Sequence, residues 1–194
     1  MKGWTSNSSH GPMAGSNLRP WTVEQMKRAV MSAAPIGTLG NPPKEEDELV
    51  NRSFRTLTIR GGRARGPLVG GNLSLLAALM GTPWEVDTSG AILLLEDVDE
   101  ELYRIDRMLT QLVLGGKLDG VAGVAFGYCT DCPVEGPSFS LEEILRERLA
   151  PLGVPAMKGL AFGHIPKMLT LPIGLAATLD ADAGTLSFDE AAVV

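Results

Sequence analysis

The sequence predicts an α/β fold with a largely parallel sheet, from three observations. Two continuously apolar segments, Ala91–Leu95 and Val121–Phe126, are typical of strands that are covered on both faces. Between them, apolar residues recur at the spacing of one helix face, at Leu102, Ile105, Leu109 and Leu112. A third short strand, Val154–Met157, follows another helical segment. Strands that alternate with helices indicate a parallel sheet, whose reactive groups gather at the carboxyl ends of its strands.

Composition narrows the classes of function. The chain has 194 residues, of which 44% are hydrophobic and 21% are charged, an ordinary globular mixture. Its formal net charge of -6 disfavours a nucleic-acid or anionic-membrane partner. No apolar run approaches the roughly 20 residues of a membrane helix, and the first residues lack the apolar centre of a secretory signal. We therefore expect a cytoplasmic protein with neither a nucleic-acid nor a membrane partner.

Three parts are expected along the chain. Residues 1–18 are polar and rich in Ser, Gly and Asn, which predicts a poorly ordered start. Residues 19–48 are predicted to hold a helix and an exposed connector that contains the acidic run Glu45-Glu46-Asp47-Glu48. Residues 49–194 are expected to form the main domain.

Two capping boxes mark helix starts. Thr22 with Gln25 predicts a helix that stops near Pro35, and Ser140 with Glu143 predicts a later one. Additional β-structure beside the parallel sheet is expected from extended segments near the end, at 169–171, 176–179 and 186–188.

A glycine-rich region lies between a predicted strand, Thr56–Ile59, and a predicted helix, Leu73–Met80. Its first half, Gly61–Pro67, is interpreted as a basic turn in which Arg63 and Arg65 either hold a substrate carboxylate or form a solvated pair.

The second half of this region, Gly70-Gly71-Asn72, lacks the Gly-Lys-[Ser/Thr] ending of a phosphate loop. It is better suited to letting the backbone approach a substrate, with Asn72 as the N-cap of the following helix. Gly71 and Asn72 are therefore candidate substrate-binding residues.

One histidine and a pair of carboxylates suggest catalysis. Glu96 and Asp97 end the apolar strand, and His164 follows Gly163 after the third predicted strand. A histidine oriented by a carboxylate is the usual general base of a hydrolase. The alternatives are a solvated acidic loop and a surface histidine. Glu96 continues the apolar strand directly, so it is expected to be the more buried of the two carboxylates.

The two cysteines, Cys129 and Cys132, have the spacing of a redox or metal-binding pair. A structural zinc site needs four ligands, and the sequence has no second pair of cysteines. We expect two loop cysteines with free thiols and no bound metal.

Taken together, these segments resemble the C-terminal part of the LD-carboxypeptidase family, the muramoyltetrapeptide carboxypeptidases. The resemblance runs from about His10 to near Phe188. It is carried by six blocks in order: Gly70-Gly71-Asn72-Leu73-Ser74-Leu75-Leu76, Gly81-Thr82-Pro83-Trp84-Glu85, Leu95-Glu96-Asp97-Val98, Tyr103-Arg104-Ile105-Asp106-Arg107-Met108-Leu109, Thr130-Asp131-Cys132-Pro133 and Phe162-Gly163-His164.

The resemblance implies a β/β/α swivelling domain that supplies a glutamate and a histidine to a serine-peptidase triad, which fall on Glu96 and His164. It implies hydrolysis of the bond to a terminal D-amino acid in murein-derived peptides during cell-wall recycling, with no cofactor or metal and with a homodimer as a candidate assembly. Related members cleave a peptide-nucleotide antibiotic.

One departure from the family is large. The nucleophilic serine is carried by an N-terminal domain in the family, whereas only nine residues precede His10 here, and no serine lies in a Gly-x-Ser-x-Gly elbow. The resemblance therefore implies that the serine lies outside this chain and that the chain alone is inactive. The alternative is a non-catalytic binding or assembly module left by truncation.

Overall fold

The computed structural model describes residues 9–10, 18–43, 54–133 and 139–193. Most of the predicted disordered start and the whole acidic run Glu45–Glu48 lie outside these ranges. In the described ranges, no helix is long and apolar enough to cross a membrane.

One mixed sheet organises the fold, in the order β2-β10-β9-β4-β5-β6-β7-β3. Its strands are β2 (Gly37–Leu39), β3 (Leu57–Arg60), β4 (Arg63–Asn72), β5 (Ile92–Val98), β6 (Gly123–Thr130), β7 (Ala156–Lys158), β9 (Ala176–Asp180) and β10 (Thr185–Phe188). A two-stranded ribbon pairs β1 (Ser9–His10) with β8 (Leu171–Pro172). The helices are α1 (Pro20–Val30), α2 (Leu73–Leu79), α3 (Leu102–Leu114), α4 (Leu141–Leu149) and the short 3-10 helix η1 (Ala150–Leu152).

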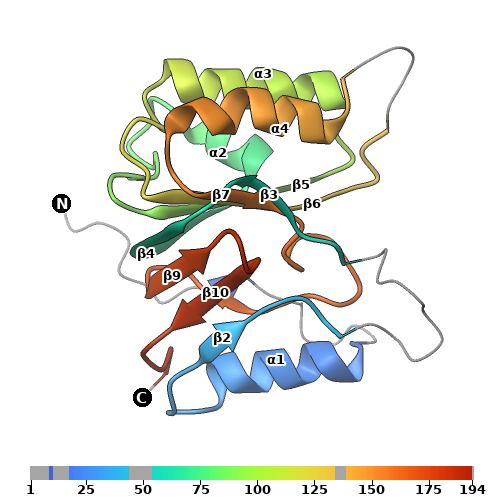
Figure 1. Ribbon diagram of the computed structural model, residues 1–194, viewed down its shortest axis with the longest axis vertical. Helices are drawn as coiled ribbons and strands as arrows, with labels where there is room; N and C mark the ends of the chain where they lie inside the picture. The colour runs from blue at the N-terminus through green and yellow to red at the C-terminus, as the bar shows by residue number, and fades with distance from the viewer. Residues whose placement is uncertain (1–8, 11–17, 44–53, 134–138, 194) are drawn as a thin grey trace.

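The predicted α/β class is confirmed. Strands β4, β5, β6 and β7 pair parallel with one another, and α2, α3 and α4 cover one face of them (Figure 1). The predicted additional β-structure is present as β8, β9 and β10. On the opposite side of the parallel strands lie β2, β9, β10 and α1 (Figure 1).

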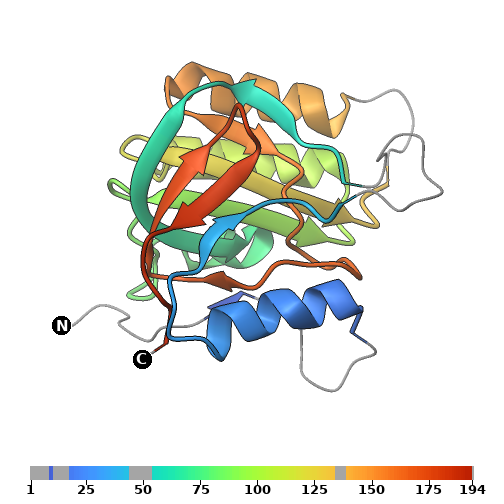
Figure 2. The ribbon, with the colours of Figure 1, turned by 60° about the horizontal axis from the view of Figure 1, so that its bottom comes forward.

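Strand β4 joins the two halves of the sheet. Its first half, residues 63–67, pairs antiparallel with β9, and its second half, residues 68–72, pairs parallel with β5. Figure 2 shows this long strand curving from one half to the other. The predicted basic turn at Gly61–Pro67 is therefore wrong, because only its first two residues turn and the rest is strand.

Two hydrophobic cores lie on the two faces of the parallel strands. Alternate residues of β5 belong to each, so that Leu93 and Leu95 face the helices and Ile92 and Leu94 face the opposite side. This period of two follows from strand geometry, and it decides which way each side chain after Leu95 points.

The helix starts agree only in part with the sequence. Ser140 caps α4 in the predicted capping box with Glu143, and Asn72 caps α2 by accepting a hydrogen bond from the Leu75 N–H. Thr22 is not an N-cap, because α1 begins at Pro20 after Arg19. Pro20 suits the first helical position, and Thr22 is fully buried instead.

The predicted exposed connector over residues 34–48 is also wrong in its described part. Residues 37–39 form β2, which pairs with β10, and Ile36 and Leu39 are buried in the second core. Strand β2 therefore forms one edge of the sheet.

The capping box predicts the effect of a surface substitution. The Ser140 N–H and hydroxyl both bond Glu143 Oε2, and these bonds lower the pKa of Glu143. Ser140→Ala should reduce the free energy of unfolding by about 1 kcal/mol in urea titrations at pH 7. The lowered pKa of Glu143 contributes its full stability above the pKa of the unfolded carboxyl and loses it as the pH falls through the folded pKa. The loss caused by Ser140→Ala should therefore shrink as the pH falls below about 4. Ser140→Thr, which keeps a capping hydroxyl, is the control; an equal loss in both variants would contradict this assignment.

Candidate active site

Glu96 and His164 meet at the carboxyl end of β5. Glu96 is fully buried, whereas the His164 side chain is 54% exposed. His164 Nδ1 lies 3.0 Å from Glu96 Oε2. The two residues are 68 positions apart in sequence, so the fold alone brings them together.

An irregularity in β6 allows this approach. The β5–β6 register shifts between Leu95 and Asp97, so that two residues of β6, Gly127 and Tyr128, lie opposite the single residue Glu96 of β5. The Tyr128 N–H instead donates to the Phe162 carbonyl at 3.0 Å. The bulge thus turns β6 toward the segment that carries His164.

Glycines make the contact sterically possible. A Cβ on Gly127 would lie 2.4 Å from the Phe162 carbonyl oxygen, far inside contact distance. Gly163 has φ +114, and a Cβ there would lie 3.2 Å from Glu96 Oε2. Both positions therefore require the residue that lacks a side chain.

The hydrogen bond assigns roles to the imidazole nitrogens. A carboxylate can only accept, so Nδ1 donates to Glu96 and Nε2 of the neutral ring is left as the acceptor. Glu96 Oε1 is buried, and no partner for it occurs among the residues that the structure describes. Because a buried carboxylate is costly unless it is hydrogen-bonded, the contact with His164 supports the burial of Glu96. The arrangement can hold a proton-accepting nitrogen toward solvent.

Asp97 points to the opposite face of β5 and serves a different purpose. Its side chain is buried and accepts from Asn72 Nδ2 at 2.9 Å, from the Ser74 N–H at 3.0 Å and from the Ser74 hydroxyl at 2.8 Å. It therefore ties the start of α2 to β5. The alternative of a solvated acidic loop is wrong for both Glu96 and Asp97.

Gly71 and Asn72 lie at the same edge of the sheet as Glu96. Asn72 pairs in register with Glu96, and Gly71 pairs with Leu95. Gly71 has φ +145, and nothing lies within 4 Å of the position a Cβ would take. The Asn72 amide is held at both ends, by the Leu75 N–H and by Asp97. The open side of Gly71 can thus admit a ligand close to the backbone.

Tyr128 was missed by the sequence reasoning. Burial raises the pKa of Tyr128 to about 12. Its ring packs edge-on against Phe54, with centroids 6.0 Å apart. The phenol therefore stays protonated near neutral pH and cannot act as a base there. No sequence pattern marked it, because its importance comes from the bulge.

The prediction of free thiols is wrong. Cys129 and Cys132 form a disulfide. Their Cα atoms are 5.6 Å apart, which suits a disulfide, and Asp131 between them has φ +52, so the chain turns back on itself. In the parts of the chain that the structure describes, no group of three His, Cys, Asp or Glu side chains could hold a metal ion.

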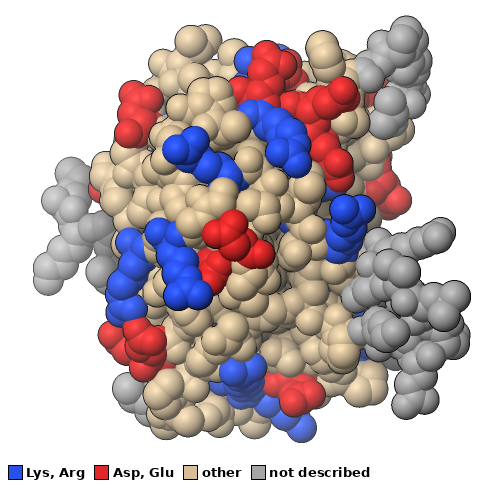
Figure 3. Space-filling view, viewed as in Figure 1, with Lys and Arg blue, Asp and Glu red and all other residues tan. Residues whose placement is uncertain are grey.

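Arg63 and Arg65 lie far along β4 from Glu96 and are paired. Arg63 Nε lies 2.6 Å from Asp180 Oδ2, and Arg65 forms an ion pair with Asp189. On the face seen in Figure 3, basic and acidic side chains are likewise interspersed. Both arginines are therefore solvent-exposed and held in ion pairs. Of the two predicted alternatives, a solvated pair agrees with the structure better than a site for a substrate carboxylate.

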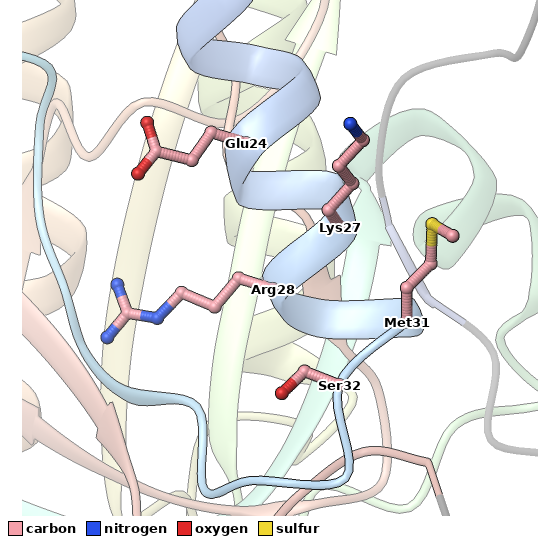
Figure 4. A pocket seen from close by; sticks show the side chains of 5 residues that line it. All are labelled: Glu24, Lys27, Arg28, Met31 and Ser32. Atoms are coloured by element: carbon pink, nitrogen blue, oxygen red, sulfur yellow. The ribbon is translucent and has the colours of Figure 1, made fainter.

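A hollow of about 520 Å³ lies against α1, and none of the predicted site residues is among those that line it. It is lined by Glu24, Lys27, Arg28, Met31 and Ser32. Figure 4 shows Glu24 and Arg28 on one side of the helix and Lys27 and Met31 on the other. Because its polar groups do not converge, it lacks the features of a ligand site.

Residues 65–179 match the residue pattern of the LD-carboxypeptidase C-terminal domain. The chain belongs to this family. A protein of Synechocystis sp. that is named as a carboxypeptidase on a provisional basis is 49% identical to this chain over 186 residues. The match covers 93% of this chain and 56% of that protein. The chain therefore spans just over half the length of this relative.

Solved structures agree with the family fold. The muramoyltetrapeptide carboxypeptidase from Oxalobacter formigenes is 29% identical, with a TM-score of 0.76, and the match covers 95% of this chain and 62% of that one. The microcin C7 self-immunity protein MccF in complex with aspartyl sulfamoyl adenosine is 26% identical, with a TM-score of 0.79 over 96% of this chain and 62% of that one. The predicted swivelling α/β fold of LD-carboxypeptidases is confirmed.

The Glu96–His164 contact predicts a spectroscopic result. At a pH where the ring is neutral, long-range 1H–15N spectra should show His164 with its proton on Nδ1. Glu96→Ala should remove this preference, because no carboxylate then accepts from Nδ1. Glu147→Ala, which deletes an exposed carboxylate on α4, should leave the spectrum unchanged. A His164 signal that is insensitive to Glu96→Ala would contradict the geometry.

Gly163→Ala tests the steric argument. Forcing alanine into φ +114 beside Glu96 should reduce the free energy of unfolding by about 2–3 kcal/mol and disturb the His164 ring signals. Gly174→Ala is the matched control, because Gly174 has φ +92 but open space around its Cβ position. It should lose about 1–2 kcal/mol from backbone strain and leave His164 unaffected. Equal effects of the two variants on His164 would refute the steric account.

Proposed function

We propose that this chain is the glutamate- and histidine-bearing part of a serine-type LD-carboxypeptidase. The observation that carries the proposal is the 3.0 Å contact between the half-exposed His164 imidazole and the fully buried Glu96 carboxylate. The Glu96 carboxylate orients His164 through Nδ1, which leaves Nε2 as the proton acceptor. A histidine and a carboxylate in this arrangement are two of the three members of a serine-hydrolase triad. The nucleophilic serine is supplied by residues outside this chain.

In this mechanism, His164 Nε2 takes the proton of the serine hydroxyl as the oxygen attacks the peptide carbonyl carbon. Glu96 stabilises the imidazolium that forms. As the tetrahedral intermediate collapses, the C–N bond breaks and His164 returns the proton to the leaving amine of the terminal D-amino acid. Water then hydrolyses the acyl-enzyme by the same proton transfers in the second half of the reaction.

The proposed substrate is a murein-derived peptide. Support comes from the muramoyltetrapeptide carboxypeptidase that shares this fold. Gly71 is proposed to contact the peptide, because it is open and lies at the same sheet edge as Glu96. Asn72 is proposed to line the same site beside it, with its side-chain amide already bonded to the Leu75 N–H and to Asp97. We place the reaction in cytoplasmic recycling of the cell wall. The complex of MccF with aspartyl sulfamoyl adenosine favours a peptide-nucleotide as the second substrate class to test.

A non-catalytic binding or assembly module is the second candidate. It is favoured by large apolar side chains exposed on and near α2 and α3, of which Leu75 is 65%, Trp84 63% and Leu114 83% exposed. Exposed apolar residues of this size are typical of surfaces that contact a partner or a second copy of the chain.

The decisive assay is D-alanine release from a murein tetrapeptide. The chain alone should release none, since loss of a nucleophile removes most of the rate enhancement. Mixed with a serine-bearing N-terminal domain of the same family, it should release D-alanine. In that mixture, His164→Ala should lower kcat by about 10⁶-fold and Glu96→Ala by about 10⁴-fold.

Arg63→Ala is the control for this assay, because it removes a charged side chain remote from Glu96 and should leave the rate unchanged. A folded chain that binds the serine domain or the tetrapeptide without any turnover would support the binding module. Turnover that does not depend on His164 would reject both the triad and the assigned base.

A further inference from the structure

The segment that carries His164 has little regular structure of its own. Residues 159–170, here called the histidine loop, connect β7 to β8 without forming a helix or strand. Within it, the Leu169 N–H donates to the Ala161 carbonyl at 2.7 Å, and the Ile165 N–H donates to the Gly163 carbonyl at 3.0 Å. A loop of this kind needs outside contacts to hold one side chain to the precision that catalysis requires.

Thr22 of α1 holds the loop just after His164. Its side chain is fully buried. The Thr22 hydroxyl donates to the Pro166 carbonyl at 3.3 Å and accepts from the Met168 N–H at 3.2 Å. One hydroxyl thus bridges two backbone groups that lie more than 140 residues away in sequence.

Asn41 holds the loop just before His164. Its Nδ2 donates to the Gly159 carbonyl at 2.7 Å and to the Phe54 carbonyl at 2.8 Å. Its Oδ1 accepts from the Ala161 N–H at 2.7 Å. This side chain uses both donor hydrogens and its oxygen in fixing the loop entrance.

We propose that Thr22 and Asn41 are positioning residues for His164. Their bonds bracket the histidine, at residues 159 and 161 on one side and at 166 and 168 on the other. Both residues lie outside the matched range 65–179, so the N-terminal segment that contains α1 and β2 belongs to the scaffold of the site. The proposal deepens the proposed function, on which the catalytic value of His164 rests.

This role is more specific than general stability. Many buried hydrogen bonds stabilise the fold, but those of Thr22 and Asn41 end on the backbone within a few residues of His164. Their loss should let the loop shift at Pro166 or at Gly159 while the sheet and its helices stay intact. Such a shift would lengthen the bond between His164 Nδ1 and Glu96, because Glu96 is fixed in β5.

The test uses Thr22→Val in the chain as it exists. Valine has nearly the shape of threonine but leaves the Pro166 carbonyl and the Met168 N–H without their partner. Amide exchange at Met168 should rise by about tenfold, and the Nδ1–H form of His164 in 1H–15N spectra should lose its dominance. Thr22→Ser, which keeps the hydroxyl, should restore both signals.

Thr88→Val is the matched control. Thr88 is also buried, and its hydroxyl donates to the Lys117 carbonyl at 2.6 Å, but it precedes β5 at the end remote from Glu96. This variant should lose comparable thermal stability and leave the His164 and Met168 signals unchanged. If Thr22→Val fails to fold, Asn41→Asp tests the other side of the loop. Aspartate keeps the size and the acceptor for the Ala161 N–H but cannot donate to the Gly159 and Phe54 carbonyls, so the Nδ1–H form of His164 should again lose its dominance.

The outcomes separate this proposal from the proposed function. A folded Thr22→Val or Asn41→Asp chain with an unchanged His164 signal would overturn the positioning role, even if the mixture with a serine domain is active. An altered His164 signal in a chain whose wild-type mixture releases no D-alanine would keep the positioning role and reject the carboxypeptidase activity. In an active mixture, Thr22→Val should lower kcat by roughly tenfold to a hundredfold and change KM little.

Discussion

The candidate site depends on one backbone hydrogen bond, from the Tyr128 N–H to the Phe162 carbonyl. This bond forms because the regular pairing of β5 with β6 ends at the pair Leu95 and Phe126, directly before Glu96. Gly127 and Gly163 remove the two side chains that would stand between the bulge and the loop. Together with the bonds of Thr22 and Asn41 to the histidine loop, this contact sets how near the ring comes to the buried carboxylate.

The end of β5 separates two acidic residues by the simplest rule of strand geometry. Glu96 continues the row of Ile92 and Leu94, and Asp97 continues the row of Leu93 and Leu95. Glu96 therefore contacts the half-exposed imidazole of His164, whereas Asp97 bonds residues at the start of α2. The chemical difference between them comes from their surroundings and not from their type.

The N-terminal segment has a larger part in the molecule than its composition suggests. Between them, α1 and the residues around β2 cover the second core, add an edge strand and supply two polar side chains to the histidine loop. Polar contacts of this kind carry no periodic pattern. Thr22 illustrates the difficulty, because the same residue type suits a helix N-cap and a buried bridge between loop carbonyl and amide groups.

The sequence by itself determined the alternation of strands and helices, the cap of α4 by Ser140, the cap of α2 by Asn72 and the choice of Glu96 and His164 as candidates. These features depend on local spacing and on residue chemistry, which are readable without a fold. The tertiary structure alone decided that Arg63 lies in a strand, that Cys129 and Cys132 are joined, and that Thr22 and Asn41 reach the histidine loop. Each of these depends on segments that are distant in sequence or on a turn of the backbone, and hydrophobic periodicity encodes neither.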